Sequence, residues 1–245
     1  MKIRLLLLIF FNGLFVYVFA QDQEKITPSQ FGYTGIIYTP TAYLPKWKTI
    51  DAGFTHFSKE TSFTYLGGIE SERAFITNLV FLPRVALTVK LTRPYSVVRP
   101  DYQPGSGQQR NWGIGDRSYS LRVQVLEEKD NRPSLVLGIQ DPFANLAFFH
   151  TNYLVASKKI PISEISILTN IGYGISLEDT NGDYLQGLFG GIQVSWKGII
   201  ANIEYDTKNL NIGLGYQLKE RLFFNMALIN AKYFSGNISY RFGLN

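Results

Sequence analysis

Histidine and serine are the side chains of this sequence best suited to acid–base or nucleophilic chemistry. His150 could act as a general base beside an acidic neighbour, with Ser157 or Ser118 as the nucleophile, as in enzymes that use a serine–histidine pair. No spacing in the sequence supports such a site. For His150, and for His56 at the end of an expected strand, a place at the rim or in the interior of the fold is favoured over catalysis.

A glycine-containing stretch superficially resembles a phosphate-binding loop. Gly113, Gly115 and Asp116 have part of the pattern, but no helix follows and Ser118 replaces the third glycine. We therefore interpret these glycines as the start of a strand.

A second stretch has the alternating oxygen-bearing side chains of a calcium loop, at Asp179, Asn181 and Asp183. Tyr184 stands where that loop requires glycine, and no glutamate follows at the right distance. A hairpin loop is favoured over weak calcium binding, and we predict no metal site and no cofactor.

Composition excludes several classes of protein. The 245 residues include no cysteine, which excludes disulfide scaffolds, thiolate zinc sites and cysteine nucleophiles. An apolar content of 45% excludes a disordered chain, and no apolar run long enough for a membrane helix follows the first twenty residues. The formal charge of +5, or +3 without Lys2 and Arg4, is too weak and too evenly spread to indicate nucleic-acid binding.

The first twenty residues predict a cleaved secretion signal. Lys2 and Arg4 precede an apolar stretch from Leu5 to Phe19, and we expect the mature chain to start at Gln21. The stretch is interrupted by polar and glycine residues and lacks a basic stop-transfer flank, which disfavours a retained anchor.

The mature chain alternates between apolar and polar residues with a period of two. Near the carboxy terminus, Phe234, Ile238, Tyr240 and Phe242 alternate with small or polar residues, which describes a strand with two unlike faces. Counting such runs predicts about twelve strands, near residues 48–57, 73–81, 85–93, 114–126, 134–141, 149–158, 164–176, 187–196, 199–206, 210–217, 221–230 and 233–244.

The connections predict two different ends of a barrel. Expected outer loops are 58–72, 94–113, 142–148, 177–186, 207–209 and 231–232, and expected inner turns are 82–84, 127–133, 159–163, 197–198 and 218–220. Long loops opposite short turns are typical of bacterial outer-membrane barrels. Residues 63–68 are alternatively part of an extra strand.

Periodicity alone does not show which face of the strands contacts water, and a soluble β-sandwich would have the same alternation of apolar and polar residues. Small or polar residues on one face and aromatic residues near the ends of the other favour the membrane barrel. In that case the charged side chains opposite the apolar face would enter the lumen, as structural ion pairs or, alternatively, along a selective polar path: Asp116, Arg122, Glu204, Asp206 and Arg241.

The longest irregular segment, residues 94–113, carries candidate sugar contacts. Tyr95, Tyr102 and Trp112 could stack on the apolar faces of sugar rings. Anchoring at an aromatic rim explains Trp112 equally well.

Four short sequence motifs lie in order over roughly residues 31–160. The first contains Gly32, Thr34, Gly35, Thr39, Pro40 and Thr41, and the others are Gly113-Ile114-Gly115-Asp116-Arg117-Ser118, Gly138-Ile139-Gln140-Asp141 and Tyr153-Leu154-Val155-Ala156-Ser157-Lys158. Together these motifs resemble the YjbH/GfcD group of outer-membrane proteins associated with exopolysaccharide and capsule loci. The resemblance implies an outer-membrane location, a role in making or exporting surface polysaccharide, and no established catalytic residues.

The sequence thus predicts an all-β protein, a transmembrane antiparallel barrel of about twelve strands. We expect a signal peptide at 1–20, an extended periplasmic leader at 21–47 that lines or plugs the mouth, and a barrel at 48–245 in the outer membrane of a diderm bacterium. The expected function is non-enzymatic assistance to production, export or anchoring of an exopolysaccharide, with outer-membrane lipid, the polysaccharide and periplasmic export proteins as partners. The alternatives are a barrel enzyme acting on lipid or glycan and a narrow solute channel.

Overall fold

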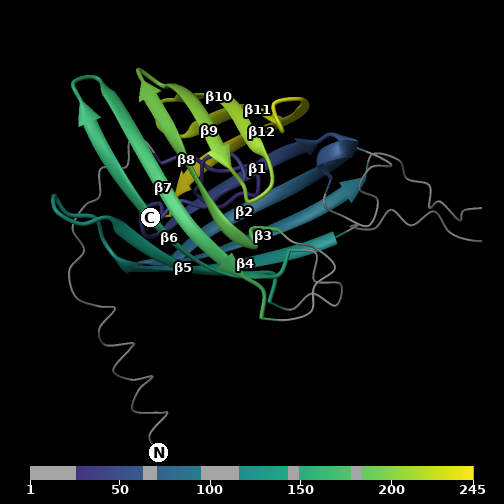
Figure 1. Cartoon of the computed structure of the whole chain (residues 1–245), viewed down its shortest axis with the longest axis horizontal. Helices are drawn as coiled ribbons and strands as arrows, with labels where there is room; N and C mark the ends of the chain where they lie inside the picture. The colour runs from purple at the N-terminus through teal and green to yellow at the C-terminus, as the bar shows by residue number, and fades with distance from the viewer. Residues whose placement is uncertain (1–25, 63–70, 95–115, 143–148, 178–183, 245) are drawn as a thin grey trace, which may run out of the picture.

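The computed structural model describes residues 26–62, 71–94, 116–142, 149–177 and 184–244, which form one closed antiparallel barrel (Figure 1). Each strand pairs with its neighbours in sequence, and the first strand pairs with the last to close the ring. The strands are β1 (Thr49–Phe57), β2 (Glu72–Leu82), β3 (Val85–Pro94), β4 (Asp116–Leu126), β5 (Ser134–Gln140), β6 (Thr151–Ile162), β7 (Ile165–Ile175), β8 (Gly187–Trp196), β9 (Ile199–Tyr205), β10 (Leu210–Leu218), β11 (Leu222–Ile229) and β12 (Tyr233–Gly243).

These bounds confirm the all-β barrel of about twelve strands that the alternation predicted. The main difference lies between β6 and β7, where the expected turn at 159–163 is too long. Residues 159–162 pair with 165–168 across the two strands, so only Ser163 and Glu164 form the connection. β6 therefore extends further than the expected 149–158, whereas β7 is close to the expected 164–176.

The short connections use backbone conformations that suit tight hairpins. Lys197 and Gly198 have φ values of 47° and 87°, and Asn230 and Ala231 both have 52°. Two successive residues with positive φ match the right-handed twist of the strands that they join. We call the end of the barrel that carries the β2–β3, β6–β7 and β8–β9 turns the short-turn end. The opposite end, which carries the β11–β12 turn with Asn230 and Ala231, is the long-loop end.

The gaps in the described ranges at 63–70, 95–115, 143–148 and 178–183 separate strands whose described ends lie at the long-loop end. The possible extra strand at 63–68 and the signal at 1–20 lie outside the described residues. Next to β1, a short 3-10 helix spans Lys59–Thr61. Within the described ranges no helix is long and apolar enough to cross a membrane.

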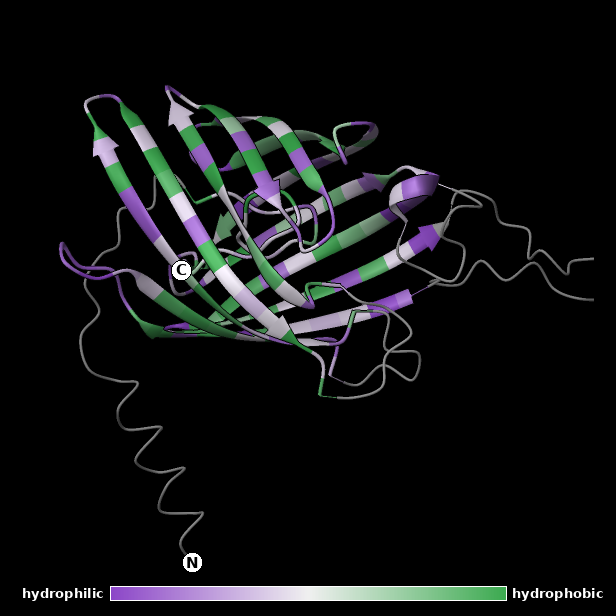
Figure 2. Ribbon diagram, in the orientation of Figure 1, coloured by the Kyte–Doolittle hydropathy of each residue, from purple (hydrophilic) through white to green (hydrophobic). Residues whose placement is uncertain are grey.

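The two faces of the wall are the reverse of those of a soluble barrel. Large apolar side chains on alternate residues are exposed on the outside, for example Ile171 and Tyr173 at 59% each. Polar residues between them face inward and are buried, as the alternating colours of the strands in Figure 2 illustrate. Each strand thus presents an apolar surface outward and hydrogen-bonding side chains inward.

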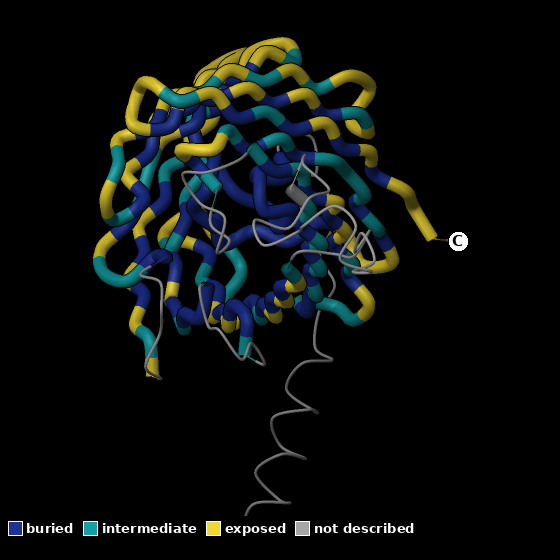
Figure 3. Tube along the Cα trace, turned by 90° about the vertical axis from the view of Figure 1, so that its right-hand side faces the viewer, coloured by how far each residue is buried: buried dark blue, intermediate teal, exposed yellow. Residues whose placement is uncertain are grey.

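The interior of the ring is occupied by the chain that precedes β1. Residues 26–45, which we call the lumen segment, are all buried, and they appear as dark blue chain within the ring in Figure 3. The sequence predicted an extended leader here. In the structure this part of the leader is compactly folded and surrounded by the strands.

Candidate functional site

The lumen segment folds into two consecutive turns that satisfy part of its own backbone. Ser29 N donates to Tyr33 O (2.7 Å) around the first turn, and Ile36 N donates to Thr39 O (3.0 Å) around the second. Gly32 has a φ of +93°, and a Cβ there would lie 2.8 Å from Cβ of Ile76 on the wall. Glycine is therefore required both by the turn and by its close approach to β2.

Glu204 on β9 binds the second turn. Its carboxylate accepts hydrogen bonds from three successive backbone amides, those of Ile37 (2.9 Å), Tyr38 (2.7 Å) and Thr39 (3.0 Å). It also accepts one from Thr39 Oγ1 (2.8 Å) and one from Asn211 Nδ2 (3.0 Å). Successive N–H groups that converge on one point form an anion site, and this one is filled by a side chain of the wall.

Arg122 on β4 binds the other side of the same segment. Its guanidinium donates to Thr34 Oγ1 (2.6 Å), to Thr41 O and to Tyr43 O (3.4 Å). Its side chain is completely buried. A buried cation is stabilised by such hydrogen bonds, so Arg122 connects the two halves of the lumen segment to the wall.

Neighbouring wall residues bind the end of the segment nearest the short-turn end. Ser134 Oγ on β5 donates to Ala42 O (2.6 Å), and Ala42 N donates to Ser157 Oγ (2.8 Å) on β6. On the opposite side, Asn225 Nδ2 on β11 donates to Pro28 O (3.3 Å). The segment is thus held by hydrogen bonds around the whole circumference.

Aromatic rings cover the first turn at the long-loop end. Phe31 contacts Phe149 and Tyr184, with ring centroids 5.7 Å and 4.9 Å away. Lys90 on β3 places its ammonium 3.4 Å from the centroid of Phe149 and 4.5 Å from that of Phe31. A buried ammonium is attracted to the faces of such rings.

Three carboxyl groups lie near Lys90 at this end of the barrel, those of Asp116, Asp141 and Glu72. Asp141 follows β5 with a φ of 54°, and its backbone N donates to Tyr119 O. Burial, reinforced by the nearby charge of Asp116, raises the pKa of Asp141 to about 6, while Lys90 opposes that rise. This group therefore titrates close to neutral pH.

The five predicted lumen charges have different positions. Arg122 and Glu204 bind the lumen segment, whereas Arg241 pairs with Asp51 across the β1–β12 seam, with Nε–Oδ1 at 2.6 Å and Nη2–Oδ2 at 2.9 Å. Asp116 lies at the long-loop end of β4. Asp206 accepts bonds from Lys208 N (3.1 Å) and Asn209 N (2.8 Å), which orders the β9–β10 connection.

The residues weighed for catalysis are dispersed. His150 Nδ1 lies 3.0 Å from Ser176 Oγ, not near Ser157 or Ser118. Ser157 binds the lumen segment, and Ser118 Oγ accepts a hydrogen bond from Gln140 Nε2 (3.1 Å). His56 lies on the outer face of β1. In the part of the chain that the structure describes, no group of three or more histidine or acidic residues could hold a metal ion.

The first family motif lies inside the barrel, where it binds wall residues that are far away in sequence. Thr34 and Thr41 bind Arg122, Thr39 binds Glu204, and Asn170 Nδ2 donates to Pro40 O (2.9 Å). Gly35 carries an antiparallel bridge to Pro40. Of the other motifs, Asp116, Arg117, Ser118 and Asp141 lie on or beside the long-loop halves of β4 and β5, residues 153–158 lie on β6, and Gly115 lies outside the described residues.

The candidate sugar contacts Tyr95, Tyr102 and Trp112 also lie outside the described residues.

Four inward-facing polar residues were not predicted as lumen groups: Asp51, Lys90, Asn170 and Asn211. Strand alternation does place each of them on the inward face, so parity applied to every strand, and not only to the most polar ones, could have found them.

A family model described as "YjbH: Exopolysaccharide biosynthesis protein YbjH" matches residues 27–183. The chain belongs to the YjbH family. The matched range covers well over half of the sequence and includes the lumen segment from Thr27 onward and β1–β7. Of the residues that hold the segment, this YjbH range contains Arg122 but not Glu204. No curated protein matches the sequence.

Solved structures with a similar arrangement include two of a KdgM porin. One has 9% sequence identity and a TM-score of 0.47, and the other, in complex with disordered oligogalacturonate, has 8% and 0.45. In each case the match covers 80% of this YjbH-family chain and 99% of the porin.

Proposed function

We propose that this protein is a non-enzymatic outer-membrane barrel that serves the production or export of a surface exopolysaccharide. We further propose that its lumen segment closes the path through the lumen of the barrel. Family membership supports the link to exopolysaccharide biosynthesis. The outward apolar face supports the membrane location, because such a surface is stable in lipid and prone to aggregation in water.

One observation carries the proposal of a closed path: side chains from nine strands hydrogen-bond to the lumen segment. Apolar side chains of the segment, among them Phe31, Ile36 and Tyr38, also pack in one buried cluster with apolar side chains of the wall. The segment therefore fills the lumen and closes it through polar and apolar contacts together.

The testing experiment compares the wild-type protein with a variant that lacks residues 31–42, in planar bilayers and in cells. We expect low conductance for wild type and a large, sustained conductance for the variant. In a deletion strain, wild type should restore the surface polysaccharide and the variant should not restore normal export. Equal conductance of the two proteins, or full export by the variant, would contradict the proposal. Heat-modifiable migration on gels shows that each barrel is folded.

A second candidate, an enzyme at the rim, is favoured by the contact between His150 and Ser176. No carboxylate is hydrogen-bonded to His150 among the described residues, so the pair lacks the third group that orients a catalytic histidine. Loss of turnover on a glycan or lipid substrate in a folded His150→Ala variant would favour this function. Unchanged polysaccharide production in that variant would favour the non-enzymatic role.

A further inference from the structure

Basic side chains form a row on the outer face of the barrel at its long-loop end. His56 on β1 is directly opposite Arg73 on β2, and Arg73 is directly opposite Arg93 on β3. Arg117, on β4, pairs with Leu91 and is therefore one diagonal step from Arg93. The alternating burial of these strands places all four on the outward face. Directly and diagonally opposed residues lie within reach of long side chains, so these residues can act on one ligand.

The row is confined to one side of the barrel. On β5–β12, the outward residues nearest the long-loop end are uncharged, namely Ile139, Asn152, Ile175, Leu188, Tyr205, Leu210, Leu228 and Phe234. Placing like charges opposite each other on one face of a sheet is unfavourable. Their grouping on the neighbouring strands β1–β4 suits a multiply charged anion, which can contact several of them at once.

An apolar surface lies directly below the row. Phe54 and Phe75, two residues further from the long-loop end on β1 and β2, contact each other edge to face with centroids 5.6 Å apart. Tyr119 is the next outward residue after Arg117 on β4. The arginines thus lie where a band of apolar side chains ends, which is the depth of lipid headgroups in a membrane barrel.

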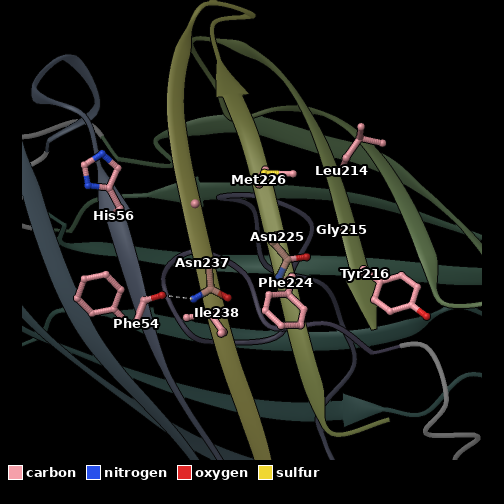
Figure 4. A pocket seen from close by; sticks show the side chains of 11 residues that line it. Phe54, His56, Leu214, Gly215, Tyr216, Phe224, Asn225, Met226, Asn237 and Ile238 are labelled. Carbon is pink, nitrogen blue, oxygen red and sulfur yellow. Dashed lines mark hydrogen bonds between the residues drawn. The ribbon is translucent and has the colours of Figure 1, made fainter. Parts of the chain in front are cut away.

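A groove on the outer wall begins at the same place. Its volume is about 430 Å³, and Figure 4 shows His56 and Phe54 on one side and Met226 and Phe224 on the other. Gly236 lies between them, where the absence of a side chain on β12 deepens the groove. His56 belongs to both the groove and the basic row, so the two features are continuous.

We propose that this surface binds a phosphorylated lipid of the outer leaflet. The phosphate groups bind Arg73, Arg93 and Arg117, with His56 beside them, and one acyl chain lies in the groove past Gly236. Guanidinium groups suit phosphate because they donate paired hydrogen bonds to it. The inference rests on the proposed membrane location but is independent of what passes through the lumen.

A lipid accounts for the surface better than an acidic glycan. The basic groups lie on the outer wall, whereas a glycan in transit would contact the lumen. An apolar groove beside the charges has no role in binding a soluble glycan, but it matches an acyl chain attached to a phosphorylated headgroup.

The test measures lipid bound to the purified full-length protein by native mass spectrometry, with bisphosphorylated lipid A, dephosphorylated lipid A and an alginate oligomer as probes. We expect wild type to bind the first probe, and Arg73→Gln/Arg93→Gln to bind it at least about tenfold more weakly, because two charge-assisted contacts with phosphate are lost. The matched control, Lys197→Gln/Lys219→Gln, removes two positive charges from the short-turn end and should bind like wild type.

A second variant, Gly236→Leu, fills the groove and should weaken binding of both forms of lipid A. Equal binding of lipid A by wild type and the double arginine variant would overturn the proposal. So would preference for the alginate oligomer, or equal affinity for the dephosphorylated lipid. Fractionation of cells distinguishes the two proposals: a protein absent from the outer membrane contradicts the proposed function, whereas a membrane protein without lipid selectivity contradicts only this site.

Discussion

Glu204 and Asp51 are both buried carboxylates on the inner wall, but they bind different partners. Glu204 accepts backbone hydrogen bonds from the lumen segment, whereas Asp51 forms a paired contact with Arg241 on the adjoining strand. Glu204 thus links the wall to the lumen segment, and Asp51 links the first strand of the barrel, β1, to the last, β12. The difference indicates that closure of the lumen and closure of the barrel depend on separate charges, which single substitutions can test.

The largest expected effect follows from Glu204→Ala. The change leaves the amides of Ile37, Tyr38 and Thr39 without their acceptor, at about 1–3 kcal/mol for each buried group. The lumen segment should detach, so conductance in planar bilayers should rise and amide hydrogen exchange in residues 26–45 should accelerate. The barrel should still migrate as a folded species before boiling. Unchanged exchange at residues 37–39 would show that Glu204 does not hold the segment.

Asp51→Ala should lower the stability of the barrel without raising its conductance, the opposite of the effect expected for Glu204→Ala. It leaves Arg241 buried at the β1–β12 seam without its carboxylate, which costs about 3–5 kcal/mol. The temperature at which the folded band is lost on gels should fall, while conductance stays low. The double variant Asp51→Asn/Arg241→Gln removes both charges and should recover most of the lost stability. A double variant no more stable than Asp51→Ala would contradict the pairing.

Arg122→Lys should have a smaller effect on the lumen segment than Glu204→Ala. Lysine keeps the charge but cannot donate to Thr34 and Thr41 with the fixed geometry of a guanidinium. We expect a loss of about 1–3 kcal/mol in the binding of the segment, seen as faster exchange at residues 34–43 with only brief conductance openings. Openings as long as those of Glu204→Ala would show that the two contacts are equivalent.

The smallest expected effect concerns pH. Because burial raises the pKa of Asp141 to about 6 from an ordinary value of 3.8, the folded state binds a proton more readily than the unfolded state. Its contribution to stability is therefore complete below pH 3.8 and is lost as pH rises through 6. Asp141→Asn should remove this part of the pH dependence of the gel-shift temperature. An identical pH profile in the variant would rule out Asp141 as its source.

The fold was largely predictable from sequence because every strand of a barrel carries its own period-two signal. That alternation located twelve strands with small errors at their ends, as between β6 and β7, where paired residues continue to Ile162. The two possible orientations of the faces could not be separated by periodicity. Exposed residues such as Leu214 and Met226 resolve this, because both are large, apolar and outward.

The site was less predictable because its contacts are not local. Parity placed Arg122 and Glu204 on the inward face, yet it gave no sign that both bind the backbone of residues 34–43. Nothing in the period-two pattern of the wall predicts that the leader folds inside it. The signal that was available lay in the leader itself, where Gly32 and Gly35 mark turns in a segment first expected to be extended.

The hydrogen bond from Ile37 to Glu204 joins residues 167 apart in the chain, and that separation has a consequence for folding. Contacts between distant residues form slowly, because the entropy of ordering the intervening chain must be lost first. The anion site for the lumen segment is therefore complete only after β9 has entered the sheet. Since β1 follows the segment directly and must also pair with β12, the segment has to be enclosed as the wall assembles around it, which makes its docking a late step that depends on a correctly built barrel.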